Sequence, residues 1–198
     1  YEGMNQHYAL KYDFKNILSM SFAGAEVSWY RQSPEVLYGS YYDGIVQHTI
    51  SRHTSENSDM LSAKVHASQG FDWRRLKIGA SVTYSYYDSP LLVQDAVVRY
   101  TGNSFGVNTD ISLTPFKWLS MSYQGNYSQS ATQQKGQERF PWLRTVTNKG
   151  TLDFTIPGGV TLTTSLYHYY NNFNDGCHRY QAGIYAELPA KERIPAHI

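Results

Sequence analysis

The feature that most constrains the fold is a long, strict alternation of apolar and polar residues. In LKIGASVTYSYY (76–87) the even positions are apolar or aromatic, and the odd positions are small or polar as far as Ser85. Successive side chains of a β-strand point to opposite faces, so this spacing predicts a strand with one apolar and one polar side. LSMSYQGNY (119–127) repeats the pattern, with Leu119, Met121 and Tyr123 on its apolar side.

The same alternation covers most of the chain, and no helical pattern of useful length competes with it. It recurs in residues 8–14, 61–71, 105–113 and 152–156. One stretch changes parity: Leu18, Met20 and Phe22 share one parity, whereas Val27 and Trp29 share the other. That change predicts a β-bulge near Ala23–Gly24.

The connections between these segments are of two kinds. Short turns rich in aromatic residues or glycine occur at 14–16, 71–75, 115–118 and 157–159. Longer polar or Tyr- and Pro-rich stretches occur at 31–44, 87–95, 133–142 and 171–176. A meander with short turns at one end and long loops at the other is typical of a transmembrane β-barrel. Residues 43–58 interrupt the rhythm and are expected to extend a long loop beyond the membrane.

We therefore expect an all-β fold, an antiparallel up-and-down meander that forms a transmembrane β-barrel or partial barrel of about 8–10 strands. At 198 residues the chain is long enough for a single domain. We place that domain at residues 1–188 and expect an irregular tail at 189–198.

Composition removes several classes of protein. The mean hydropathy is −0.50, and no stretch approaches the ~20 apolar residues of a membrane-spanning helix, although a barrel strand needs apolar residues only at alternate positions. The net charge is +1 and only Arg74 and Arg75 are adjacent, which argues against a nucleic-acid partner. A single cysteine, Cys177, excludes an internal disulfide framework and a cysteine-cluster metal site.

Aromatic residues at the strand ends favour lipid as the cover of the apolar side. An aromatic ring with a polar edge suits the headgroup level of a bilayer, and barrels carry one such belt at each rim. Residues 76–86 match the ~9–11 residues with which a tilted strand crosses the hydrocarbon layer. The expected interface residues are Phe14, Trp29, Trp73, Tyr84, Tyr86, Trp118, Tyr127 and Tyr169.

The polar side fits a watery lumen, because it carries Ser, Thr, Asn and Gln together with charged residues such as Lys64, Asp110 and Asp153. A soluble β-sandwich could turn the same side to solvent, so this composition is compatible with both folds.

The long loops concentrate residue types that dominate recognition surfaces. Tyrosine and tryptophan supply broad stacking area, and arginine supplies a rigid charged fork. The candidate ligand-binding residues are Tyr38, Tyr41, Tyr42, Phe140, Trp142 and Arg144. The alternative is that these aromatic residues pack the loops or belong to the outer belt.

No catalytic or metal-binding pattern is present. A nucleophile, a base and an orienting group need to converge within hydrogen-bonding reach, and nothing in the spacing of Asp43 and His48, or of Asp88 and Ser89, indicates that. The histidines are scattered; His48 and His53, for example, differ in parity. We expect no enzyme activity, no cofactor and no metal.

The run from Gly70 to Ser130, with FDWRR, PFKW and their flanking strands, resembles the C-terminal barrel part of TonB-dependent receptor-like outer-membrane proteins. The resemblance extends over residues 5–175. It implies a location in the cell outer membrane of a Gram-negative bacterium and import of a small-molecule or glycan nutrient. It also implies a barrel of about 22 strands with a plug, driven by the TonB complex.

Relative to that family, the chain is expected to be a fragment without the plug domain, so that TonB would act only through a missing upstream region. Its end, which carries Pro189 and Pro195 and stops at Ile198, departs from the aromatic last strand of such barrels. Two other functions stay open at this point. One is a stand-alone small porin or adhesin, and the other is a soluble β-sandwich that binds carbohydrate.

Overall fold

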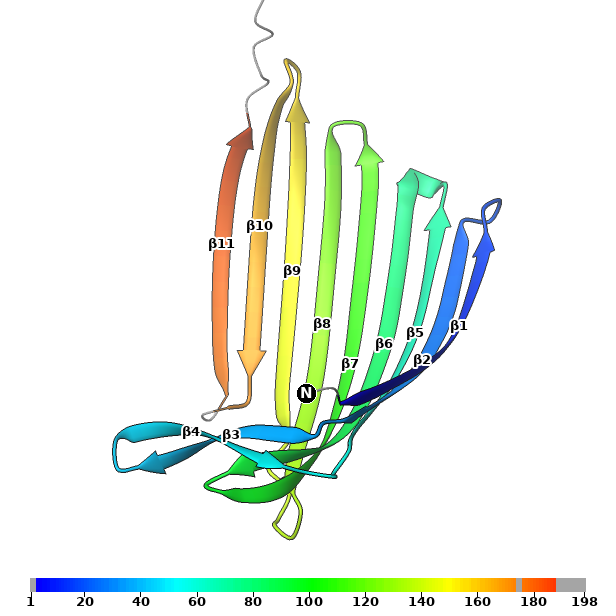
Figure 1. Cartoon of the computed structure of the whole chain (residues 1–198). Helices are drawn as coiled ribbons and strands as arrows, with labels where there is room; N and C mark the ends of the chain where they lie inside the picture. The colour runs from blue at the N-terminus through cyan, green and yellow to red at the C-terminus, as the bar shows by residue number, and fades with distance from the viewer. Residues whose placement is uncertain (1–2, 174–175, 188–198) are drawn as a thin grey trace, which may run out of the picture.

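The computed structural model describes residues 3–173 and 176–187, which form one antiparallel sheet (Figure 1). Its strands are β1 (Met4–Asn16), β2 (Ser21–Ser33), β3 (Val36–Asp43), β4 (Val46–His53), β5 (Ser58–Phe71), β6 (Leu76–Val93), β7 (Ala96–Phe116), β8 (Leu119–Gln134), β9 (Leu143–Ile156), β10 (Val160–Asn171) and β11 (Cys177–Glu187). The only helical segment in the described ranges is the 3-10 turn η1 (Trp73–Arg75). The all-β prediction is confirmed, and the tail predicted at 189–198 lies outside the described residues.

The strands run up and down in sequence order, as the alternation of short and long connections predicts. The main path is β1-β2-β5-β6-β7-β8-β9-β10-β11, with β3 and β4 beside it. The sheet has 11 strands, so removing these two leaves nine on the path. Figure 1 shows the short turns stepping along one end of the curved sheet, while the longer connections gather at the other end.

β3 and β4 form a hairpin that leaves the main path and lies crosswise at the long-loop end (Figure 1). Gly44 turns this hairpin with a φ of +60°, a conformation that favours glycine. The hairpin is tied to the sheet by a short parallel pairing, Gly39 to Leu92 and Ser40 to Val93. The segment 43–58, which interrupts the rhythm of the sequence, therefore extends the connection between β2 and β5.

β6 and β7 continue well past their neighbours and close in a tight turn at Gln94–Asp95, both with positive φ. The predicted loop at 87–95 is therefore mostly strand. Pro90 is tolerated here because the pairing of β5 with β6 ends at Asp59–Asp88. Position 90 therefore has no β5 residue that needs a backbone N–H donor from β6.

The few buried apolar side chains also lie toward this long-loop end. Pro90 is fully buried, and Leu92 and Ala131 are nearly so. Among the described residues, no other apolar side chain is buried. The part of the chain that the structure describes therefore has no extended apolar core beneath its sheet.

The bulge predicted near Ala23–Gly24 is wrong. β2 keeps an unbroken register with β1 and with β5, and Met20 belongs to the preceding turn, where its φ is +50°. Leu18 lies in the same turn, whereas Phe22 lies in β2 opposite Lys15 and Ser68, on the other side of the sheet from Val27 and Trp29. The register shifts instead in β7 between Leu113 and Phe116, where Pro115 removes a backbone donor.

The sheet is open at both sides in the described residues. β1 pairs only with β2, and β11 pairs only with β10. Side chains on these edges are the most exposed of the sheet: Leu10 on β1 is 77% exposed and Ile184 on β11 is 72% exposed.

Replacing Gly39 by alanine is expected to undock the β3–β4 hairpin. A Cβ atom at Gly39 would lie 2.0 Å from the backbone oxygen of Leu92, so one of the two strands has to shift. We expect a cost of about 1–3 kcal/mol to the docked state, seen as faster amide exchange at Leu92 and Val93. Gly150→Ala is the matched control, because its Cβ meets nothing within 4 Å. Equal exchange in both variants would contradict the close approach.

Candidate functional site

The register divides the sheet into two chemically different faces. Val82 lies opposite Val65 and Val107, and this row continues to Tyr127 and Val146. We call this side the apolar face. The next row places Ser81 opposite His66 and Asn108, and continues to Asn126 and Thr147. We call this side the polar face.

The apolar face has no protein cover within the described residues. Val82 is 41% exposed, Ile111 38% and Met121 39%, although all three lie in the middle of the sheet. The neighbouring strands cover the sides of these three side chains. Their exposed fraction therefore lies on the apolar face itself. A soluble sandwich would place a second sheet ~10 Å away over such a face, and the described strands all belong to one sheet.

Aromatic rings mark both ends of the apolar face. At the long-loop end, Trp29 stacks on Tyr8 with centroids 5.6 Å apart, and the guanidinium of Arg31 lies 4.9 Å from the indole centroid. At the short-turn end, Trp118 stacks on Phe116 at 5.1 Å. A second arginine–tryptophan pair lies there as well, Arg74 over Trp73 at 4.8 Å. Each rim therefore combines an aromatic ring with a nearby cation.

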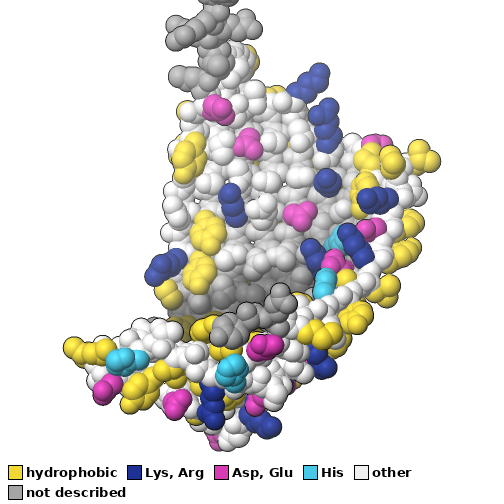
Figure 2. Space-filling model, viewed as in Figure 1, with side chains coloured by type: hydrophobic (Ala, Val, Ile, Leu, Met, Phe, Trp, Pro, Cys, Tyr) yellow, Lys and Arg dark blue, Asp and Glu magenta, His cyan; other side chains and the backbone are white. Residues whose placement is uncertain are grey.

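The polar face lines the hollow of the curved sheet. Figure 2 looks into this hollow and shows basic, acidic and histidine side chains along it. Hydroxyls and amides bond across neighbouring strands: Ser28 and Ser62 are 2.7 Å apart, the Thr163 hydroxyl donates to Asp153 at 2.6 Å, and the Asn126 amide donates to Asn108. The register puts charges of both signs on this face: Lys11, Lys64, Lys77, Lys149 and Arg179 with Asp13, Glu26, Asp110 and Asp153.

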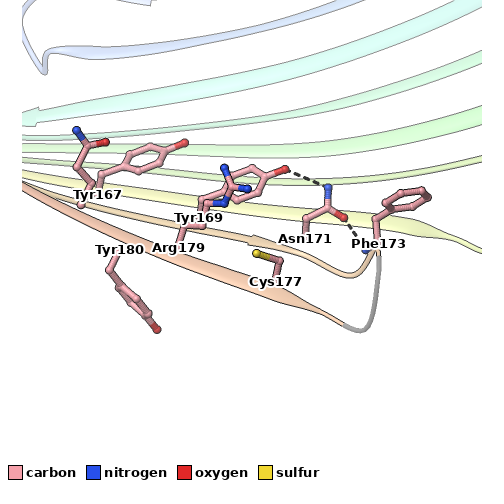
Figure 3. A pocket seen from close by; sticks show the side chains of 8 residues that line it. Tyr167, Tyr169, Asn171, Phe173, Cys177, Arg179 and Tyr180 are labelled. Carbon is pink, nitrogen blue, oxygen red and sulfur yellow. Dashed lines mark hydrogen bonds between the residues drawn. The ribbon is translucent and has the colours of Figure 1, made fainter.

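A large hollow on the polar face lies over the paired strands β10 and β11, close to their long-loop end (Figure 3). It measures about 1010 Å³, the upper part of the range usual for small-molecule sites. Three cross-strand pairs line it, and we call this hollow the β10–β11 pocket: Tyr167 with Gln181, Tyr169 with Arg179, and Asn171 with Cys177. Phe173 adds a ring at the mouth, whereas Tyr180 points away from the others (Figure 3).

Hydrogen bonds of Asn171 hold the long-loop end of the pocket in place. The Asn171 amide donates to the Tyr169 hydroxyl at 3.0 Å, and its carbonyl oxygen accepts from the backbone N–H of Phe173 at 2.7 Å. Arg179 makes no ion pair within the part of the chain that the structure describes. No carboxylate belongs to the lining, so the pocket offers aromatic faces, amides and one cation.

Ion pairs organise the base of the long loops, just beyond the aromatic rim. Arg31 and Asp59 form a two-bond pair, Nε to Oδ1 at 2.7 Å and Nη2 to Oδ2 at 3.1 Å. Arg99 donates to Asp88 at 2.6 Å and to Glu56 at 3.3 Å. The hydrogen bond from Arg31 holds the pKa of Asp59 below its usual value, against the opposing effect of burial. The bond to Asp88 raises the pKa of Arg99.

The predicted ligand-binding residues of the loops fall into two groups in the structure. Tyr38, Tyr41 and Tyr42 lie on β3, with Tyr41 tilted against His48 at 6.3 Å. Trp142 lies before β9, where the guanidinium of Arg139 is 4.5 Å from its ring and its carbonyl oxygen accepts from Asn172. Phe140 and Arg144 are exposed near it. The described residues show no ring contact or hydrogen bond between the β3 group and the group around Trp142.

Most predicted interface aromatics lie on the apolar face or in the turns that border it. Phe14, Trp29, Tyr84, Tyr86 and Tyr127 fall on that face by register, and Trp73 and Trp118 lie in short turns. Tyr169 differs. It pairs with Thr147 and Arg179, so it lies on the polar face and lines the β10–β11 pocket.

The pocket residues were missed in the sequence, although a signal for them exists. Tyr167, Tyr169 and Asn171 alternate along one segment, and Cys177, Arg179 and Gln181 alternate along the next segment after the turn. Such facing sets indicate a common side only when the two segments are known to pair. The register of β10 with β11 supplies that information.

Comparison with known proteins adds no identification: no protein-family model matches the chain, and no curated protein matches it. Among the described residues, no helix has the length and apolar character needed to cross a bilayer. In the same residues, no three His, Cys, Asp or Glu side chains gather as a metal site would require.

The Arg31–Asp59 pair predicts a pH-dependent stability. We expect Asp59→Asn to lower the free energy of unfolding by about 0.5–1 kcal/mol at pH 7. Because the pKa of Asp59 is lower in the folded chain, the contribution is complete above the unfolded value of about 3.9 and is lost as the pH falls through the folded value. Urea unfolding of both proteins between pH 3 and pH 7 checks this. Asp43→Asn, in an exposed hairpin turn, is the control. A difference in stability between the two proteins that does not shrink as the pH falls from 5 to 3 would contradict the assignment.

Proposed function

We propose that the chain is a section of the wall of an outer-membrane β-barrel, of the TonB-dependent receptor-like type that imports a nutrient. The observation that carries this proposal is the bare apolar face. Central side chains such as Val82 and Ile111 stay about two-fifths exposed, while the opposite face is bonded and charged. Hydrocarbon chains are the natural cover for an apolar face outside a polar hollow.

The dimensions of the apolar face support lipid as that cover. From Leu76 to Tyr86 a strand extends roughly 33 Å, at ~3.3 Å per residue. Tilted by about 40°, it spans about 25 Å, the height of the apolar band of a barrel. Tyr86 and Trp29 lie in one row at the long-loop limit of this band, and the Arg31–Asp59 pair lies two rows beyond it.

The layout of the connections supports the transporter type. Tight turns close one end, and the other end carries the crosswise β3–β4 hairpin, the extended β6–β7 hairpin and the loop around Trp142. Elaborate loops on one rim suit a barrel that binds ligand from outside the cell. The resemblance of the run from Gly70 to Ser130 to TonB-dependent receptors points the same way. In this role the partners are the bilayer, a small-molecule or glycan nutrient and, through other parts of the transporter, the TonB complex.

A pair of lysine substitutions at neighbouring positions tests the lipid-facing assignment. Val82→Lys places a charge on the apolar face, where we expect a cost of about 2–4 kcal/mol to the folded state in lipid. Ser81→Lys places the same charge on the polar face, where we expect less than about 1 kcal/mol because the ammonium stays in water. Denaturant titrations in lipid vesicles measure both, with β1 and β11 paired to the other strands of the barrel.

The soluble alternatives give a different result. In a water-soluble protein the exposed Val82 position accepts lysine with little cost, so equal stabilities for the two variants would contradict the proposal. The stand-alone porin or adhesin differs in another way: the chain alone would insert into planar bilayers and give stable conductance steps, which a section of a larger wall does not give.

A further inference from the structure

We infer that the β10–β11 pocket binds an acidic saccharide, a sugar unit that carries a carboxylate. This inference rests on the proposed function, because it takes the polar face as the inner wall of a transport barrel. It names the class of ligand that the wall contacts and places the contact away from the loop aromatics predicted in the sequence.

The first requirement of a sugar site is a flat ring on which its C–H face can lie. Tyr167 and Tyr169 stand two residues apart on the same side of β10 and both line the pocket, with Phe173 at its mouth (Figure 3). Each ring has an apolar body and, in the tyrosines, a hydroxyl at its edge. Tyr169 is fixed by Asn171, so little side-chain freedom is lost on binding.

The second requirement is a set of donors and acceptors for hydroxyl groups. Gln181 faces Tyr167 across the strand pair, and Asn171 lies beyond Tyr169. An amide side chain both donates and accepts, which matches the hydroxyl of a sugar. The pocket is therefore better suited to a polyhydroxylated ring than to a purely apolar ligand.

The charge of the pocket selects the acidic class. Arg179 lies opposite Tyr169, and its planar guanidinium can hold a carboxylate through two parallel hydrogen bonds. It forms no ion pair within the described residues, and the lining contains no carboxylate that would neutralise it or repel an anion. A neutral sugar would leave this cation unused.

A second hollow extends the site along the same wall. It measures about 330 Å³, and Tyr167 lines both hollows. Its other residues include the amides of Asn108, Gln124 and Asn126, together with Lys149 and the carboxylate of Asp110. Lys149 on β9 lies in the same row as Tyr167 and Gln181, and β10 separates it from Arg179 on β11. The second hollow therefore offers amides to the hydroxyl groups of a longer saccharide, while the opposite charges of Lys149 and Asp110 leave the selection of the acidic unit to Arg179.

Binding of two matched trisaccharides to the protein in detergent micelles, with β1 and β11 paired to the other strands of the barrel, tests the inference. The probes are a galacturonate trisaccharide and the neutral galactose trisaccharide, measured by isothermal titration calorimetry. We expect the acidic probe to bind at least tenfold more tightly. Arg179→Met is expected to remove about tenfold or more of that affinity without changing the neutral probe. Tyr169→Leu is expected to weaken both probes.

Lys77→Met is the matched control, because Lys77 lies on the same polar face on the distant strand β6 and lines neither hollow. Far-ultraviolet circular dichroism confirms that each variant keeps its sheet. Equal binding of the two probes, or an acidic probe that binds Arg179→Met as well as the original chain, would overturn the inference.

The two proposals fail separately. If Val82→Lys is tolerated as well as Ser81→Lys while the acidic probe still binds through Arg179, the membrane assignment fails and the pocket stands. If the lysine pair behaves as expected and neither trisaccharide binds, the pocket fails and the wall of the barrel stands.

Discussion

A β-strand places neighbouring side chains on opposite faces, and one face of this sheet meets no other part of the chain among residues 3–173 and 176–187. The remaining features depend on that imbalance. Side chains as apolar as Ile111 and Met121 stay open in the centre of the sheet, while Pro90 and Leu92 are buried only where the hairpins fold over the long-loop end. A chain of this length that folded in water would concentrate its apolar residues beneath a second layer. Here the second layer is absent among the described residues, and the proposed bilayer takes its place.

The polar face follows a different physical rule. Its hydroxyls, amides and charges are close enough to bond across neighbouring strands, as in the Ser28–Ser62 contact and the Thr163–Asp153 bond. These bonds satisfy polar atoms without removing the surface from water. The same regular spacing makes binding surfaces possible, because residues of one parity on two paired strands converge on one hollow. Tyr169 and Arg179 meet in this way.

The sequence predicted the features that are set within a single strand and missed those that depend on the pairing of two strands. Alternation alone assigned Val82, Ile111 and Met121 to a common face, and the order of short and long connections indicated the meander. The stretch around Tyr169 was harder, because Tyr167, Tyr169 and Tyr170 occupy both parities and give no preference for a side. Turn signals also misled: Pro90 and its neighbours indicated a loop, yet the strand continues because its edge there needs no donor. The β10–β11 pocket required the cross-strand register, which no local pattern contains.

The two open margins of the sheet have a consequence for how this wall is completed. Along β1 and along β11, every second backbone amide and carbonyl points sideways without a ladder partner in the described residues. In hydrocarbon each such orphan group costs several kcal/mol, so a ribbon with two bare seams is not a stable solute of a bilayer. In the proposed membrane setting, other strands have to pair with β1 and β11 before lipid can surround the outside of the sheet. The step that commits the sheet to the membrane is then the pairing of these two edges rather than the folding of the hairpins.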